Sequence, residues 1–213
     1  MKLELAREFG GGVIWHLVPA KEGRIALEIR SEDQLEVRFV VVDLQTKDQA
    51  SFESDVLDWW TALQGFGKRG LIFKRFADDK DPSKHEYFEL LSTGDSKSAT
   101  PEDIVEAGLA YPQFYQAGST SFQLVADYLW EHKVKAVAGA EYTEWRDLIV
   151  VGYYQAVGDL LDRHLLALDR EGVAVLHEKI DTGMQGVVFE SFFTFTEYLV
   201  FVKERKELNV YRA

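Results

Sequence analysis

Residues 163–181 read "RHLLALDREGVAVLHEKID", and this stretch decides the fold class. An apolar run ends at Asp169, a short polar turn "REG" follows, and a second, mixed run returns. The pattern predicts a β-hairpin, because short polar turns that contain Asp or Gly reverse apolar strands. Residues 38–55, "RFVVVDLQTKDQASFESD", repeat the outline with Asp43 in the place of Asp169.

Strand signals continue along most of the chain. Residues 24–30, "RIALEIR", alternate Ile, Leu and Ile with Ala, Glu and Arg, which is the period of a half-buried strand. Roughly twelve to fifteen strands and at most two helices result, far from an ordinary mixed composition. The other clear strand-like runs are 13–18, 35–44, 71–76, 86–91, 138–145, 148–154, 163–169, 173–179, 187–195, 198–204 and 208–212.

One segment fits a helix as well as a strand. In residues 121–133, "SFQLVADYLWEHK", the apolar side chains match both periods. The length of the run and Ser121, a good N-cap residue, favour a helix. Residues 55–60 stay open between a short helix and a strand, and the polar segments 78–85, around Pro82, and 92–103 are predicted loops.

The predicted fold class is therefore mainly β. We expect antiparallel meanders in a propeller-like array, incomplete or few-bladed, or in a sandwich-like array, with one or two helices. The spacing from Asp43 to Asp169 equals three propeller blades of roughly 42 residues, and four or five such blades would fill the chain. We expect a single domain over residues 1–213, built from repeated antiparallel β-hairpins.

Two family resemblances bear on this expectation. Residues 167–177, "ALDREGVAVLH", resemble the repeat of quinoprotein-type β-propellers, although His177 stands where that repeat often has Trp. The set "YPQFY", "AEYTEW", "LIVVGYYQ" and "LVFVKERKELNVYR" is similar to a small bacterial family of unknown function with propeller-like strands. The second resemblance covers most of the chain. Both imply a fold, and neither implies an activity or a cofactor, so no cofactor is expected.

The amino-acid composition limits the kinds of partner and chemistry that we expect for this protein. The net charge of −12 repels phosphate backbones, so we expect no nucleic-acid binding. The absence of cysteine excludes disulfides, thiolate nucleophiles and cysteine metal sites. No apolar run has the length of a signal peptide or of a membrane span, so we expect no membrane association and a cytoplasmic protein.

No motif with chemistry survives a structural check. "GFGKRG" at 65–70 has the glycine spacing of a dinucleotide site, but a strand is predicted after it where that site needs a helix. The aromatic runs "YPQFY", "WW" and "GYY" would make stacking surfaces, although such residues more often fill cores. Glu141, Tyr153 and Tyr154 flank one predicted turn, and we take them as the candidate ligand-binding residues.

His164 and His177 form the other candidate pair. If the hairpin pairs Asp169 with Gly172, the two histidines lie directly opposite each other and could share a metal ion with Glu190. A bulge at Gly172 would separate them. Surface histidines are the more ordinary outcome, so no metal is expected.

These observations favour a β protein that acts as a non-enzymatic interaction or scaffold domain, and its expected partner is a protein. The alternative is a small-molecule-binding or hydrolytic enzyme with an aromatic-lined pocket beside Tyr153 and Tyr154.

Overall fold

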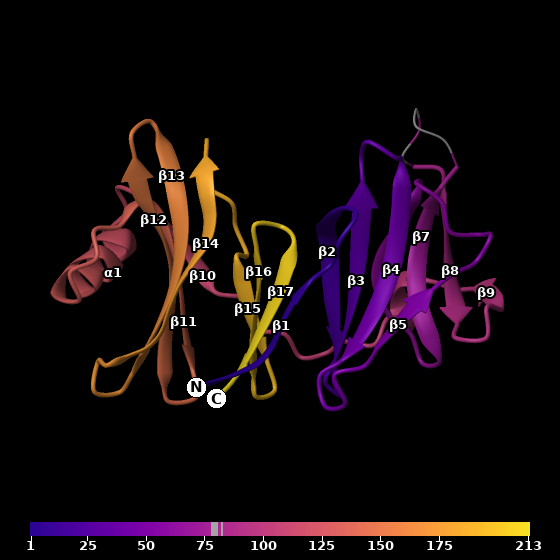
Figure 1. The fold of residues 1–213 in the computed structure, drawn as a ribbon, viewed down its shortest axis with the longest axis horizontal. Coiled ribbons are helices and arrows are strands. Elements are labelled where there is room, and N and C mark those ends of the chain that lie inside the picture. The colour runs from indigo at the N-terminus through magenta and orange to yellow at the C-terminus, as the bar shows by residue number, and fades with distance from the viewer. Residues whose placement is uncertain (78–80, 82) are drawn as a thin grey trace. The chain divides into compact units, whose positions relative to one another are not determined.

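The structure, a computed structural model, describes residues 1–77, 81 and 83–213. The described residues form seventeen β-strands, one α-helix and one short 3-10 helix, arranged in four sheets (Figure 1). Every strand pair whose register is defined is antiparallel, and three of the sheets follow the chain order as simple meanders. The expectation of a mainly β, antiparallel fold with one or two helices is confirmed. Among the described residues, no helix has the length and apolar character needed to span a bilayer.

Contacts divide the chain into two compact units. One unit is continuous and covers residues 7–109, whereas the other combines residues 1–6 with residues 110–213. We call them the inserted unit and the split unit. The expectation of one domain over the whole chain stays a prediction.

The inserted unit is a two-layer sandwich. Its first sheet contains β2 (Val13–Ala20), β3 (Arg24–Ser31), β4 (Glu36–Asp43) and β5 (Gln49–Phe52). Its second sheet contains β6 (Thr61–Phe66), β7 (Gly70–Phe76), β8 (His85–Leu91) and β9 (Ser96–Ser98). Side chains from both sheets form one core, in which the rings of Phe39 and Phe73 meet edge-to-face with centroids 4.7 Å apart.

The split unit also contains two sheets. The larger consists of β10 (Gln113–Gln116), β11 (Val137–Trp145), β12 (Leu148–Val157), β13 (Leu160–Asp169) and β14 (Ala174–Met184). The smaller places β1 (Lys2–Glu8) next to β17 (Glu207–Arg212), followed by β16 (Tyr198–Lys203) and β15 (Phe192–Phe195). The first strand of the chain thus completes the sheet of the last hairpin, and the two termini lie close together (Figure 1).

Two cores stabilise the split unit, one on each face of its larger sheet. On one face, helix α1 (Thr120–Glu131) covers the sheet through Phe122, Val125 and Leu129 (Figure 1). On the opposite face, side chains such as Leu165 pack against Phe192 and Phe201 of the smaller sheet. Successive residues of a strand point to opposite faces, so neighbours in sequence enter different cores.

The two aspartates of the opening pattern close equivalent turns. The Asp43 carboxylate accepts the backbone N–H groups of Gln45 and Thr46 at 2.8 and 2.9 Å. The Asp169 carboxylate accepts those of Glu171 and Val173 at 3.0 and 2.9 Å. Such local bonds explain why an Asp at the end of an apolar strand reverses the chain. Both predicted hairpins are present, as β4–β5 and β13–β14.

Several predicted boundaries differ from the structure. The helix over 121–133 exists as α1, but its N-cap is Ser119, whose hydroxyl accepts the Phe122 N–H at 3.1 Å, so the assignment to Ser121 is wrong. The predicted loop 92–103 contains β9 and the 3-10 helix Pro101–Asp103. The run 187–195 is a strand only from Phe192 onward.

Three further segments can be compared with their sequence-based predictions. Residues 55–60 form turns, so neither the short helix nor the strand considered there is present. A strand, β7, does follow the glycines at 65–70, as expected. Of the predicted loop 78–85, residues 78–80 and 82, including Pro82, lie outside the described residues.

Candidate functional site

The structure brings together two of the three residues taken as ligand-binding candidates. Glu141 pairs with Gly152 across β11 and β12, so its side chain shares a face with Tyr154, which lies two residues further along β12. This face looks toward the smaller sheet of the split unit. Tyr153 points to the opposite face, into the core beneath α1. The three side chains therefore do not converge, and their assignment to a ligand site stays a prediction.

Glu141 holds the segment that leads into β15. Its carboxylate is 1% exposed and accepts the Ser191 N–H at 3.2 Å as well as the Ser191 hydroxyl. Burial raises the pKa of Glu141, while the bonds from Ser191 and the nearby Arg163 charge act in the opposite direction. Arg163 itself donates to the Asp181 carboxylate. A carboxylate in this environment supports the backbone of its neighbour.

Tyr154 holds the same segment at a second point. Its hydroxyl donates to the Val188 carbonyl at 2.5 Å and accepts the Val188 N–H at 3.0 Å. The residues before β15 are thus fixed by buried side chains of the larger sheet. These bonds explain why the apolar run 187–195 forms a strand only in its second half.

The histidine pair adopts a register that the hairpin sequence did not predict. His164 pairs with Lys179 and His177 pairs with Leu166, because bulges in β13–β14 shift the pairing by two residues. Both rings still lie on one face, with centroids 6.1 Å apart. Glu190 does not join them, because its backbone bonds to the Glu141 carboxylate, which lies on the opposite face of the larger sheet. In the described part of the chain, no group of three or more His, Cys, Asp or Glu residues could hold a metal ion.

Tyr153 links the two histidines. Its ring stacks on His164 at 5.2 Å, and its hydroxyl lies 2.6 Å from His177 Nε2. Burial raises the pKa of Tyr153 to about 12, so the hydroxyl keeps its proton at neutral pH. Burial and the neighbouring His177 lower the pKa of His164.

A different feature stands out in the inserted unit: a turn that carries two tryptophans. Residues 58–61 read "DWWT", and Thr61 donates its N–H to the Asp58 carbonyl at 3.0 Å, which closes a β-turn with Trp59 and Trp60 at its centre. The Asp58 carboxylate also accepts the Trp60 N–H and the Thr61 hydroxyl, both at 3.0 Å. We call residues 58–61 the tryptophan turn.

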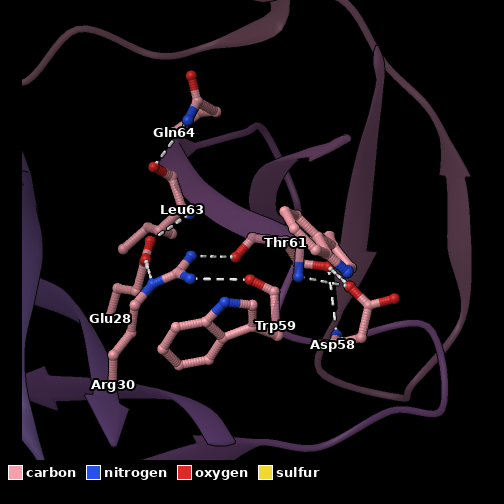
Figure 2. Close-up of polar contacts among 8 residues, drawn as sticks. Glu28, Arg30, Asp58, Trp59, Thr61, Leu63 and Gln64 are labelled. Carbon is pink, nitrogen blue, oxygen red and sulfur yellow. Dashed lines mark hydrogen bonds and ion pairs between the residues drawn. The ribbon is translucent and has the colours of Figure 1, made fainter. Parts of the chain in front are cut away.

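Arg30 fixes this turn from β3. Its guanidinium donates to the carbonyls of Trp59 and Thr61, both at 2.8 Å, and lies 4.9 Å from the centroid of the Trp59 ring. Figure 2 shows how Glu28 in turn bonds Arg30 at 2.5 Å and accepts the Leu63 N–H at 2.7 Å. One buried ion pair therefore joins β3 to the tryptophan turn and to the start of β6.

Two indoles in this region remain exposed. Trp60 is 44% exposed although its backbone is fixed by Asp58. Trp15 is 51% exposed at a β-bulge between Ile14 and His16, and the Arg30 guanidinium lies 5.7 Å from its ring. Large exposed aromatic side chains on a fixed backbone are typical of recognition surfaces.

A hollow of about 520 Å³ opens beside Trp60. Across it, Arg75 donates to Asp58 at 2.9 Å, and each of these side chains is 38% exposed. A second hollow of about 420 Å³ shares Arg75 and Glu86 with the first and extends to β9. The first hollow is lined by Asp58, Trp60, Arg75, Phe76, Ala77, Lys84, His85 and Glu86.

No model of a known protein family matches the sequence, and no curated protein sequence matches it either. Both resemblances described above stay predictions.

The pair "WW" is recognisable in the sequence as a stacking surface but not as a site. The missing step was local: Asp58 and Thr61 bracket the pair at the positions that close a turn through side-chain bonds. Arg30, 29 residues from Trp59, carries no local signal for its role.

Proposed function

We propose that the protein is a non-enzymatic recognition domain whose binding site is the tryptophan turn with the adjoining hollow. The observation that carries this proposal is the exposed Trp60 indole on a turn that Asp58 and Arg30 hold in place. A turn whose backbone is already ordered loses little entropy on binding, so a residue that it carries can contribute strongly to affinity. Trp and Arg are also the residues most enriched at binding hot spots.

The buried carboxylates support a binding role over catalysis. Glu28, Glu89 and Glu141 each accept at least one backbone N–H: Leu63 bonds to Glu28, Arg69 and Gly70 to Glu89, and Ser191 to Glu141. Their oxygens fix the chain where strands begin. A carboxylate used in this way is not positioned to move protons to and from a substrate.

A second candidate, an enzyme, draws support from Tyr153 and His177. A tyrosine hydroxyl 2.6 Å from an imidazole has the geometry of a proton-transfer pair. Loss of an activity in His177→Phe, with binding at the tryptophan turn unchanged, would favour this candidate.

The proposal is tested by a thermal-shift screen with two sets of probes, short peptides and oligosaccharides. A probe at 100 times its dissociation constant raises the free energy of unfolding by about 2.7 kcal/mol, which is readily detected. We expect at least one probe to stabilise the parent and not Trp60→Ala.

Trp130→Ala is the matched control, because Trp130 is 66% exposed on α1, in the other unit. Since both substitutions remove exposed indoles, each should change stability by no more than about 0.5 kcal/mol. Hits that bind Trp60→Ala as well as the parent, or a complete absence of hits, would contradict the proposal.

A further inference from the structure

We infer that the hollow beside Trp60 binds a neutral oligosaccharide. This inference rests on the proposed function and names the ligand class for the same site. Its basis is the juxtaposition of one exposed indole, carried by a turn whose backbone is fixed, with an exposed carboxylate–guanidinium pair.

The indole matches one side of a sugar ring. A pyranose presents a face of polarised C–H groups, and an aromatic ring presents a face of negative potential. Stacking of the two costs less entropy when the backbone that carries the aromatic ring is already ordered. Asp58 provides that support through the Trp60 N–H, and the Arg30 bonds to the flanking carbonyls prevent the turn from opening.

The polar lining matches the edge of a sugar ring. The Asp58 carboxylate accepts and the Arg75 guanidinium donates, and both remain 38% exposed while bonded to each other. The Arg75 guanidinium has five N–H donors. Within residues 1–77, 81 and 83–213, one of its nitrogens donates to Asp58, and the N–H groups of its other nitrogens are available to a ligand. Neighbouring hydroxyls of a sugar each donate and accept, so they can bond to both members of such a pair. Glu86, the strand partner of Arg75, adds a further acceptor.

Charge argues against a phosphorylated or highly anionic ligand. In the first hollow, Asp58 and Glu86 balance Arg75 and Lys84, so the lining has no excess of positive charge to attract an anion, and the chain as a whole repels one through its net charge of −12. A neutral ligand avoids this repulsion. An extended peptide that adds a strand is also disfavoured, because the sheet edge at the second hollow, β9, is only three residues long.

The second hollow gives the ligand its length. The second hollow shares Arg75 and Glu86 with the first and is also lined by Lys97 and Ser98, so the two hollows adjoin. We therefore expect oligosaccharides of several units to bind more tightly than monosaccharides do.

The experiment is isothermal titration of the full chain with four neutral hexasaccharides: β-1,4-linked glucose, xylose, mannose and N-acetylglucosamine. We expect one of them to bind, and Trp60→Ala to weaken that binding at least tenfold. Arg75→Gln should also weaken it, because the amide keeps part of the polar surface but loses the guanidinium fork. Trp130→Ala should bind as the parent does.

Two further measurements keep the outcomes distinct. Binding of a neutral hexasaccharide should change little between low and high salt, whereas binding of a sulfated oligosaccharide should depend on salt, because its charges are screened. If no neutral hexasaccharide binds while a peptide binds through Trp60, the sugar inference fails and the recognition function stands. If no probe of either class depends on Trp60, both fail. Denaturation curves of each variant show whether its fold is intact.

Discussion

At the scale of single residues, buried charge is used to hold backbone. Glu28 lies 1% exposed between Arg30 and the Leu63 N–H, and Arg30 passes the connection on to two carbonyls of the tryptophan turn (Figure 2). Each oxygen and nitrogen of this network replaces bonds that the groups had with water. Removing one member therefore leaves another buried without compensation.

The first prediction concerns this ion pair. We expect Arg30→Met to lower the free energy of unfolding by about 3–5 kcal/mol, because it leaves the Glu28 charge buried and unpaired. The double variant Glu28→Gln/Arg30→Met should be less destabilised than Arg30→Met, since no unpaired charge remains. Urea denaturation of the parent, both single variants and the double variant measures the coupling. Additive effects of the two substitutions would show that the residues act independently.

The second prediction concerns pH. Burial raises the pKa of Glu141 above its ordinary value of 4.5, so the folded state holds this proton more tightly than the unfolded state does. The stabilisation from the proton is complete below the unfolded pKa and is lost as pH rises through the folded pKa. Glu141→Gln cannot titrate and should not show this loss.

The measurement is the difference in free energy of unfolding between parent and Glu141→Gln, followed from acid to neutral pH. The difference, parent minus variant, should fall as pH rises through the folded pKa of Glu141. Taking a difference removes the contributions of carboxyls that shift the other way, such as Asp162, whose pKa Lys179 lowers. A difference that rises with pH would mean that the folded state stabilises the charged form of Glu141.

At the scale of elements, a strand in each of two sheets anchors a later segment of the chain, and the two strands use different residues to do so. Asp43 pairs with Arg24, and the carboxylate of Glu28 lies four residues further along β3. Asp169 pairs with Leu148, and four residues further along β12 comes Gly152.

At Gly152 the acid comes from the neighbouring strand. Glu141 of β11 places Oε2 only 3.1 Å from where a Cβ on Gly152 would lie, so the glycine leaves room for it. Two residues on, Arg30 and Tyr154 occupy corresponding places, and each bonds the segment that leads to the next sheet. The two sites are equivalent in their position on the strand and in the segment that they bond, but their residues differ. The repeated Asp turn is therefore visible in the sequence, whereas the repeated bonding by Arg30 and Tyr154 is not.

The third prediction concerns the start of α1. Ser119→Ala should lower the free energy of unfolding by about 1 kcal/mol, because the Phe122 N–H loses its acceptor. Ser121→Ala is the control, since Ser121 is an exposed residue within the first turn of the helix. Thermal unfolding of the two variants distinguishes them. An equal loss in both would remove Ser119 from its role as the cap.

The strands and the helix were predictable because their signals are local. Alternation identified β3, and apolar runs closed by Asp identified β4 and β13. Register was not predictable, because the bulges in β13–β14 depend on contacts beyond the hairpin. The candidate site was predictable only as an aromatic pair, because the support from Arg30 comes from a distant strand.

At the scale of the whole molecule, the path of the chain divides the two units unequally. The inserted unit is one continuous segment with its own core, whereas the split unit needs residues 1–6 together with residues 110–213. A continuous unit that has its own core meets the usual condition for independent folding.

The fourth prediction follows from this division. A fragment of residues 7–109 should unfold cooperatively on its own, as followed by tryptophan fluorescence, because its core draws only on its own two sheets. In a fragment of residues 110–213, β17 lacks its neighbour β1. This fragment should therefore be less stable alone than in the presence of residues 1–6 added as a peptide. A fragment of residues 7–109 that stays unfolded would show that this segment depends on the rest of the chain.

Because β1 pairs with β17, β1 must remain without this partner strand during most of the synthesis of the chain. The ribosome releases β1 well before its partner strand β17, and at 5–20 residues per second the interval is on the order of ten seconds or more. During that time β1 has an unpaired edge in a crowded solution. Its sequence, "KLELARE", interrupts the apolar residues with Lys2, Glu4, Arg7 and Glu8. Charges of this kind keep a waiting strand from associating with other chains, so β1 is suited to both its early synthesis and its late pairing.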